Sequence, residues 1–459
     1  MSGERRSFGL SPEAKTALLE RLARRRGATT AARQPNPATP APVRIGDLDG
    51  QDEIRVIRSA GEVLGIANPF FRTHDSIAGP RTVISGRSYL NFSSYNYLGL
   101  NGHPRVAEAA KAAIDRYGTS VSASRLVSGE RGVHRDLERG LAELYGAEDC
   151  IALVSGHATN VTVIGHLMQA KDLILHDALA HNSILQGAVL SGARRASFAH
   201  NDAAAAERLL AQHRAQHRRA LVVIEGHYSM DGDVPDLPAF IALARRHGAW
   251  LMVDEAHALG VLGRRGFGLA EHFAVDPGEV DLWMGTLSKT LAACGGYIAS
   301  RREMVEYLKF TAPGFLYSVG MSPPVAAAAL AALGLLREEP ERVRRLNANA
   351  RLFRDLAKAA GLDTGNSAGH GIVPIVTGSS IAAARLADAL FQEGINVQPI
   401  LYPAVPERSA RLRFFLCSEH GESDIRAAVA GLARAQARIA AEKPDLRALA
   451  ARLGALGGE

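Results

Sequence analysis

Cysteine is scarce in this chain, with 3 residues in a length of 459. So few cysteines exclude a disulfide framework, and no spacing of cysteine and histidine is typical of a zinc site, so we expect no metal. No apolar run approaches the ~20 residues that a membrane-spanning helix needs. The polar segment 1–8 lacks the apolar core of a secretory signal. These absences predict a cytoplasmic protein with no membrane span.

An excess of acidic residues is also lacking, and the formal net charge is +6. The basic residues are spread along the chain and alternate with acidic ones, as in 337–345. No segment combines them with aromatic residues that would stack on bases, which argues against nucleic acid as a partner. The positive charge instead favours an acidic partner, such as a carrier protein bearing phosphopantetheine, or coenzyme A.

The length of the chain predicts two lobes with appendages. Segment 1–44 combines a short helix, expected over 11–26, with a proline-rich linker. We expect 45–100 to form an N-terminal arm with a β-hairpin. The large domain is expected over 101–335 and a smaller C-terminal domain over 336–459.

The large domain shows short apolar runs separated by amphipathic helical patterns. This alternation predicts an α/β fold with an open, mostly parallel central sheet covered by helices. The expected strands are 150–154, 173–175, 220–224, 250–253, 281–284 and 296–299. In the C-terminal domain, strand candidates at 371–376 and 412–416 and a helix over 423–442 predict a smaller α+β unit.

A lysine and an aspartate follow two of these runs. Lys289 lies in a loop of small and hydroxyl residues after 281–284, and Asp254 ends the run that begins at Trp250. Ligands of open α/β sheets bind at the carboxyl ends of the strands. Pyridoxal phosphate (PLP) needs an amine for its aldehyde, an anion for its ring nitrogen and donors for its phosphate. The pair therefore predicts a PLP site.

Three further runs end in polar residues that suit the same site. Residues 155–160 follow the first run, 176–181 the second and 225–229 the third. A helix that begins at Ser155 would present backbone N–H groups to a phosphate. Five successive strands that end in polar residues capable of binding or catalysis indicate a single functional site.

Taken together, these segments resemble the α-oxoamine synthases, PLP enzymes of fold type I that include 8-amino-7-oxononanoate synthases and serine palmitoyltransferases. The resemblance extends over about residues 70–440 and depends on segments 91–100, 122–129, 155–160, 198–202, 225–232, 254–260, 285–289, 403–406 and 410–413. Residues 95–99, Tyr-Asn-Tyr-Leu-Gly, resemble serine palmitoyltransferases and their polyketide-associated relatives more than the other members.

The resemblance implies a role for each principal side chain. Lys289 would hold PLP as a Schiff base and then remove the α-proton of the amino acid. Asp254 would keep the ring nitrogen protonated, His257 would donate to the phenolic oxygen, and His181 would stack on the ring. Arg413 would bind the substrate carboxylate with its forked guanidinium, and Arg72 occupies the place of a further substrate arginine.

The resemblance also implies a set of contacts to the cofactor, chiefly to its phosphate. These are Ser155, Gly156 and His157 at the start of a helix, Thr286 and Ser288 beside the lysine, Ser229, and Ser318. Ser318 would act from the neighbouring subunit, which implies a homodimer with shared active sites. His157 departs from the family pattern, because many members have an aromatic residue there.

The implied reaction is a decarboxylative condensation of an amino acid with an acyl thioester, which gives an α-amino ketone. The segment 1–44 and the polyketide-like variant favour an acyl-carrier protein as the donor, in secondary metabolism, with acyl-coenzyme A as the other carrier. Two alternatives stay open. One is another PLP reaction, transamination or aldol cleavage, and the other is a non-catalytic subunit, which Lys289 argues against. Residues 254–257 also imitate a helicase box, but the chain has no phosphate-binding loop of the required pattern.

Overall fold

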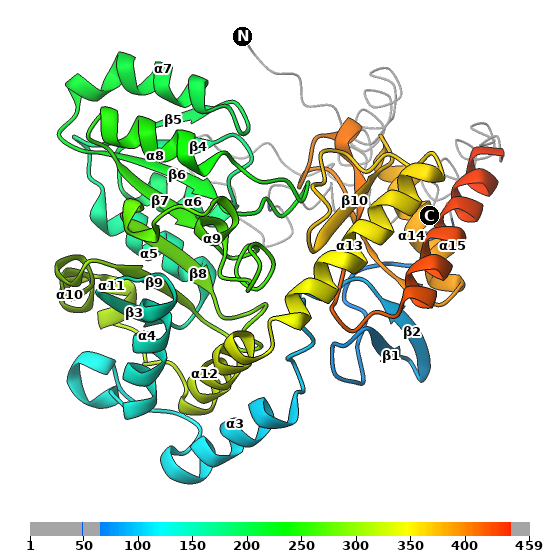
Figure 1. Cartoon of the computed structure of the whole chain (residues 1–459), viewed down its shortest axis with the longest axis horizontal. Coiled ribbons are helices and arrows are strands. Elements are labelled where there is room, and N and C mark those ends of the chain that lie inside the picture. Colours follow the sequence, from blue (N-terminus) through cyan, green and yellow to red (C-terminus); the bar gives the residue numbers. More distant parts are fainter. Residues whose placement is uncertain (1–47, 49–64, 442–459) are drawn as a thin grey trace, which may run out of the picture.

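The computed structural model describes residues 48 and 65–441 of the chain (Figure 1). The helix expected over 11–26, its proline-rich linker and the tail beyond 441 lie outside the described residues. No helix in the described part is long and apolar enough to cross a membrane.

A seven-stranded sheet forms the centre of the large domain, in the order β3-β9-β8-β7-β6-β4-β5. Its strands are β3 (Asp149–Leu153), β4 (Leu173–Asp177), β5 (Arg194–Phe198), β6 (Ala220–Glu225), β7 (Trp250–Asp254), β8 (Leu282–Thr286) and β9 (Gly296–Ser300). Within this sheet, only β9 runs antiparallel to its neighbours. The expected α/β fold with a mostly parallel sheet is confirmed, although the sequence pattern does not indicate β5.

Helices cover both faces of this sheet. They are α4 (Gly132–Leu144), α7 (Ala203–His213) and α8 (Leu237–Arg246) on one face, and α5 (Gly156–Leu167), α6 (Asn182–Leu190) and α10 (Arg302–Thr311) on the other. Alternate strand residues point to opposite faces: Val222 of β6 packs into the first layer and Leu221 into the second. Burial on both faces explains why the central strands are apolar throughout.

A smaller α+β unit forms the C-terminal part, at the right in Figure 1. Its elements are β10 (Ile372–Val376), β12 (Gln398–Ile400), β13 (Arg411–Phe415), α14 (Ser380–Gln392) and α15 (Glu422–Ala441). The strands form an antiparallel sheet in the order β10-β13-β12. The other helices are α3 (Pro104–Tyr117), α9 (Leu269–Phe273), α11 (Pro313–Leu316), α12 (Pro323–Glu338), α13 (Glu341–Ala359) and the π-helix η2 (Arg125–Gly129).

The N-terminal arm shares a small sheet with the C-terminal unit. The arm forms the expected hairpin of β1 (Arg81–Ile84) and β2 (Arg87–Asn91), and the two-residue β11 (Ile395–Asn396) pairs with β2. Tyr89 stacks on Phe391 of α14, with ring centroids 4.3 Å apart. The arm therefore packs with a segment about 300 residues away. The division at residues 44, 100 and 335 stays a prediction.

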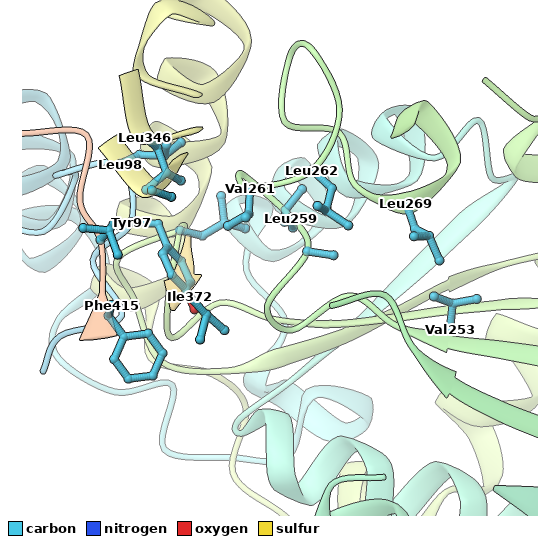
Figure 2. Packing of buried hydrophobic residues seen from close by; sticks show 14 of the residues in the cluster. Tyr97, Leu98, Val253, Leu259, Val261, Leu262, Leu269, Leu346, Ile372 and Phe415 are labelled. Carbon is cyan, nitrogen blue, oxygen red and sulfur yellow. The ribbon is translucent and has the colours of Figure 1, made fainter. Parts of the chain in front are cut away.

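A buried apolar cluster joins the C-terminal unit to the large domain (Figure 2). Tyr97 lies beside Phe415 of β13, with ring centroids 6.1 Å apart, and beside Ile372 of β10. The backbone of Gly371 is so close that a Cβ there would lie 3.0 Å from the Tyr97 ring and 3.3 Å from Val261. This packing holds β13 next to the carboxyl end of the central sheet.

Candidate active site

Three adjacent parallel strands end at the edge where the candidate residues lie. The register pairs Glu225 at the end of β6 with Asp254 at the end of β7, and Asp254 with Met284 of β8. Lys289 follows β8 in a short loop. The topology therefore brings Glu225, Asp254 and Lys289 together from separate parts of the sequence.

Lys289 provides an amine that is easily deprotonated. Its Nζ makes no hydrogen bond or ion pair with any described residue and lies 5.6 Å from the ring centroid of Tyr95. Burial lowers the pKa of Lys289 to about 8, against the opposing effect of the carboxyl groups of Asp254, which is the larger, and Glu225. A neutral amine is the form that attacks an aldehyde, so this pKa suits a residue that binds PLP covalently.

Asp254 is a buried carboxylate with a fixed orientation. Its Oδ2 accepts a hydrogen bond of 2.8 Å from Asn160 Nδ2, and its Oδ1 accepts one of 2.9 Å from the N–H of Ala256. Asn160 is held in turn by a bond of 2.9 Å to Ser183 Oγ. Only 4% of Asp254 is exposed. A negative charge at this depth favours a cation beside it, such as a protonated ring nitrogen.

Glu225 is a second buried carboxyl beside Asp254. Burial, reinforced by the charge of Asp254, raises the pKa of Glu225 to about 8. Its Oε1 accepts the N–H of His181 at 2.7 Å. Glu225 therefore anchors the backbone of His181, and near neutral pH it holds its proton.

His181 caps the N-terminus of α6 and is an exposed residue. Its Nδ1 accepts the N–H of Ser183 at 3.3 Å and lies 2.7 Å from Ser183 Oγ. The ring stands edge-on to that of His157, with centroids 6.3 Å apart. A ring that is fixed at its backbone and at Nδ1 can present its open face to a flat cofactor.

His257 is buried among aromatic rings. Its Nδ1 lies 2.7 Å from the hydroxyl of Tyr97, and its ring is within 11° of parallel to that of Phe415. Burial, together with the positive charges of Lys289 and Arg413, lowers the pKa of His257 well below its usual value. When Tyr97 donates to Nδ1, the neutral ring keeps its proton on Nε2, which is then free to donate to the phenolic oxygen of PLP.

The start of α5 and the loop after β8 form a cradle for an anion. Ser155 caps the N-terminus of α5, and its Oγ accepts the N–H of Ala158 at 3.4 Å. The first N–H groups of a helix have no partner within it. Gly156 packs so closely that a Cβ there would lie 2.7 Å from Thr286 Oγ1. Thr286 Oγ1 donates to the carbonyl oxygen of Gly295 at 2.9 Å and lies 3.1 Å from Ser288 Oγ. Backbone donors and hydroxyls thus meet at one point, as a phosphate requires.

Arg413 reaches the site from β13 of the C-terminal unit. Its Nη1 donates to the carbonyl oxygen of Ser229 at 3.0 Å, so Ser229 acts here through its backbone. Nε is buried and has no partner among the described residues. Burial lowers the pKa of Arg413, while Tyr95 opposes the shift. A desolvated guanidinium with an unpaired N–H at Nε is suited to binding a carboxylate.

We expect Arg413→Lys to raise the KM for the amino acid about tenfold, because lysine keeps the charge but loses the forked contact. The kcat at saturating amino acid should change less. Steady-state kinetics at a fixed acyl thioester concentration measure both values. Arg408→Lys, on the exposed turn Glu407–Ser409, is the matched control. An unchanged KM would remove Arg413 from the carboxylate site.

For two expected residues, the contacts within this single subunit do not include Lys289. Arg72 packs on Phe391 of α14, with 3.4 Å between its Cζ and the ring centroid. Ser318 lies in an exposed segment between Tyr317 and Val319, which are 87% and 50% exposed. The roles of Arg72 and Ser318 therefore stay predictions.

Three further side chains contact the expected ones, namely Tyr95, Tyr97 and Asn160. Asn160 is a buried polar residue on α5, five positions after Ser155, and a buried amide needs a polar partner. In the sequence, Asn160 stands out as part of the polar segment 155–160, which follows β3. Tyr97 gives no such signal, because its partner His257 is 160 positions away.

The side chains present fit PLP. An unpaired amine, a buried anion, an exposed flat ring and an anion cradle surround one edge of the sheet. Asn160 Oδ1 and Arg413 Nε are buried without partners in the described region, which indicates polar groups reserved for a ligand. The fold and the site define a PLP-dependent transferase of fold type I.

Comparison with known proteins identifies the family. The family model of aminotransferase class I and II matches residues 87–442. The 8-amino-7-oxononanoate synthase of Geobacter sulfurreducens is 45% identical over 366 residues, which are 79% of this chain and 93% of that protein. The enzyme of the same name from Fervidobacterium nodosum is 39% identical over 378 residues, 82% of this chain and 94% of that protein.

Solved structures give the same result. Serine palmitoyltransferase of Sphingomonas wittichii has a TM-score of 0.82 and 28% identity, covering 87% of this chain and 100% of that one. A serine palmitoyltransferase solved with PLP has a TM-score of 0.81 and 28% identity, covering 86% of this chain and 100% of that one. The chain belongs to the aminotransferase class I and II family, and within it to the α-oxoamine synthases. It is a PLP-dependent acyltransferase that condenses an amino acid with an acyl thioester.

Proposed function

We propose that four side chains divide the work of this condensation. Lys289 holds the cofactor and then takes the α-proton of the amino acid, and Asp254 keeps a proton on the ring nitrogen. His181 covers one face of the ring, and Arg413 grips the substrate carboxylate. When bound, PLP supplies the electron sink for the charge that is released at the α-carbon. The observation that carries this proposal is the unpaired amine of Lys289, with its lowered pKa, next to the buried Asp254.

Arg413 and Lys289 would together orient the amino acid. A carboxylate held by Arg413 at the edge of the site fixes which bond of the α-carbon stands perpendicular to the ring. The contact between Arg413 and the substrate carboxylate is lost when that carboxylate leaves as carbon dioxide. Arg413 comes from the C-terminal unit and Lys289 from the large domain, so the site depends on the packing between them.

We also propose that the acyl group arrives on an acyl-carrier protein, in a secondary-metabolite pathway. The proline-rich segment 1–44 and the net charge of +6 support a docking role for an acidic partner. Residues 95–99 support the polyketide-associated branch. A net positive charge and a docking segment at the N-terminus would raise the local concentration of the carrier.

Deletion of residues 1–43 tests the choice of donor. We expect the deletion to raise the KM for an acyl-carrier protein about tenfold and to leave the rate with acyl-coenzyme A unchanged. The full chain and the shortened chain are compared with the same acyl group on each carrier. Equal rates with acyl-coenzyme A and no effect of the deletion would contradict the proposal.

A second candidate function is that of the relatives named 8-amino-7-oxononanoate synthase, and the 45% identity favours it. The product name describes an amino ketone with a methyl group next to the amine-bearing carbon, which corresponds to alanine as the amino acid. Turnover of a panel of glycine, alanine and serine with acyl chains of different length distinguishes this candidate from the secondary-metabolite function proposed above. A strict requirement for alanine and a seven-carbon dicarboxylic acyl group would select this candidate.

We further propose a homodimer with shared active sites. Leu126 and Val127 of η2 and Tyr317 and Val319 after α11 are exposed apolar side chains on segments that contact each other. Such a patch is typical of a protein interface. A second copy that covers the patch would carry Ser318 to the phosphate of its neighbour.

A further inference from the structure

His200 lies between two carboxylates. Its Nδ1 is 2.8 Å from Asp177 Oδ1, and its Nε2 is 2.8 Å from Asp233 Oδ2. A carboxylate oxygen only accepts, and a neutral imidazole has a single N–H. Both contacts are hydrogen bonds only when both ring nitrogens carry protons. The geometry therefore requires His200 as the imidazolium cation.

The surroundings of His200 support this charge. Burial lowers the pKa of His200, but the hydrogen bonds to Asp177 and Asp233 outweigh it and raise the pKa to about 10. Asp177 is fully buried and Asp233 is 13% exposed, so neither charge is well screened by water. Asn201 bonds to the same two carboxylates, and the ring of Tyr228 stands edge-on to His200 at 4.5 Å.

Asp177 shapes the turn that carries His181. Its Oδ1 accepts the N–H of Leu179 at 2.7 Å, and its carbonyl oxygen accepts the N–H of Ala180 at 3.1 Å. His181 is the next residue. The position of Asp177 therefore sets the position of the ring proposed to cover the cofactor.

Asp233 ends the loop that holds Arg413. The carbonyl oxygen of Asp233 accepts the N–H of Tyr228 at 3.1 Å, which closes the loop 228–233. Within this loop, Ser229 accepts from Arg413, and Asp231 forms an ion pair of 2.6 Å with Arg411. The loop thus receives two arginines from β13 of the C-terminal unit.

We infer that His200 is a positioning residue: as a cation it clasps the turn before His181 to the loop 228–233, and so fixes the cofactor-covering ring relative to the carboxylate-binding Arg413. Without the cation, Asp177 and Asp233 would repel each other across the gap. The inference rests on the proposed roles of His181 and Arg413. His200 contacts neither of them directly and acts through Asp177 and Asp233.

The test compares three variants of the holoenzyme, His200→Gln, the double variant His200→Gln with Asp233→Asn, and Asp233→Asn alone. The readout is the Kd of the amino acid, from the change in the visible spectrum of bound PLP on titration with glycine, alanine or serine. His217→Gln is the control, since His217 lies before β6 at the opposite edge of the sheet and bonds only to a backbone carbonyl. PLP content and melting temperature are measured for each protein.

We expect His200→Gln to weaken amino-acid binding about tenfold while PLP content is kept, because two buried like charges then face each other. The double variant should recover most of the affinity, since one of the two charges is removed. Asp233→Asn alone should weaken binding about threefold, and it carries the test if His200→Gln does not fold. An unchanged Kd in His200→Gln, or a double variant no better than the single one, would overturn the inference.

Arg413→Ala, titrated in parallel, separates this inference from the proposed function. If Arg413→Ala leaves the Kd unchanged, the assignment of Arg413 to the carboxylate fails. If Arg413→Ala weakens binding and His200→Gln and Asp233→Asn do not, only the role of His200 fails. A fall in melting temperature with an unchanged Kd marks a purely structural residue and also overturns the inference.

Discussion

Replacement of Lys289 by alanine is expected to lower the condensation rate by about 10³-fold or more, because we propose two tasks for this one side chain. The amine would hold the cofactor and later move the α-proton, and Lys289 is a half-buried amine beside Asp254 with a pKa lowered to about 8. Added amines would restore only the proton transfer.

The loss is measured as the rate of carbon dioxide release from the amino acid in the presence of the acyl thioester. Lys171→Ala is the control, because Lys171 is exposed before β4 at the opposite edge of the sheet. The variant should keep its fold, since Lys289 makes no hydrogen bond within the described residues. A Lys289→Ala enzyme with more than a tenth of the wild-type rate would contradict the assignment.

Asp254→Asn is expected to lower kcat about 10²-fold, because the substitution keeps the shape and removes the charge that we propose to hold a proton on the ring nitrogen. The amide keeps one accepting oxygen, so it can retain the bond from Asn160 or the bond from the N–H of Ala256, but not both in this geometry. The loss of charge should also lower the pKa of Lys289 further, since Asp254 is the largest group that raises it. The acid limb of the pH–rate profile should therefore move to lower pH.

Steady-state rates across pH 6–9 measure both effects. Asp236→Asn is the matched control: Asp236 is exposed and caps α8, a role that asparagine fills equally well. A kcat above half of the wild-type value, or an acid limb that moves to higher pH, would show that Asp254 does not act on the ring nitrogen.

The sequence predicts the central sheet wherever burial makes a strand apolar throughout. β4, β6, β7 and β8 are such strands and were expected almost at their observed bounds. β5 is an edge strand with the sequence Arg-Arg-Ala-Ser-Phe, in which only Phe198 is buried. A strand with so little buried surface leaves no apolar run to detect. The two-residue β11 is undetectable for a similar reason, since its pairing with β2 joins residues about 300 positions apart.

The site residues likewise divide into those that the sequence predicts and those that only the structure places. Asp254 ends β7, and Lys289 and His257 follow β8 and β7 closely, so the rule that ligands bind at strand ends brings them together from the sequence alone. The contact of Arg413 with Ser229 spans 184 positions, and only the packing of the C-terminal unit places it there. The two bonds of His200 are likewise invisible in the sequence, because nothing local pairs a histidine with carboxylates 23 and 33 positions away.

Reduction of the holoenzyme with borohydride, followed by peptide mapping, tests the central claim most directly. Borohydride makes the bond between PLP and its lysine permanent, and mass spectrometry then finds the labelled peptide. We predict one label per chain, on Lys289, and loss of the yellow colour together with activity. A label on another lysine, or reduction that leaves activity intact, would contradict the account.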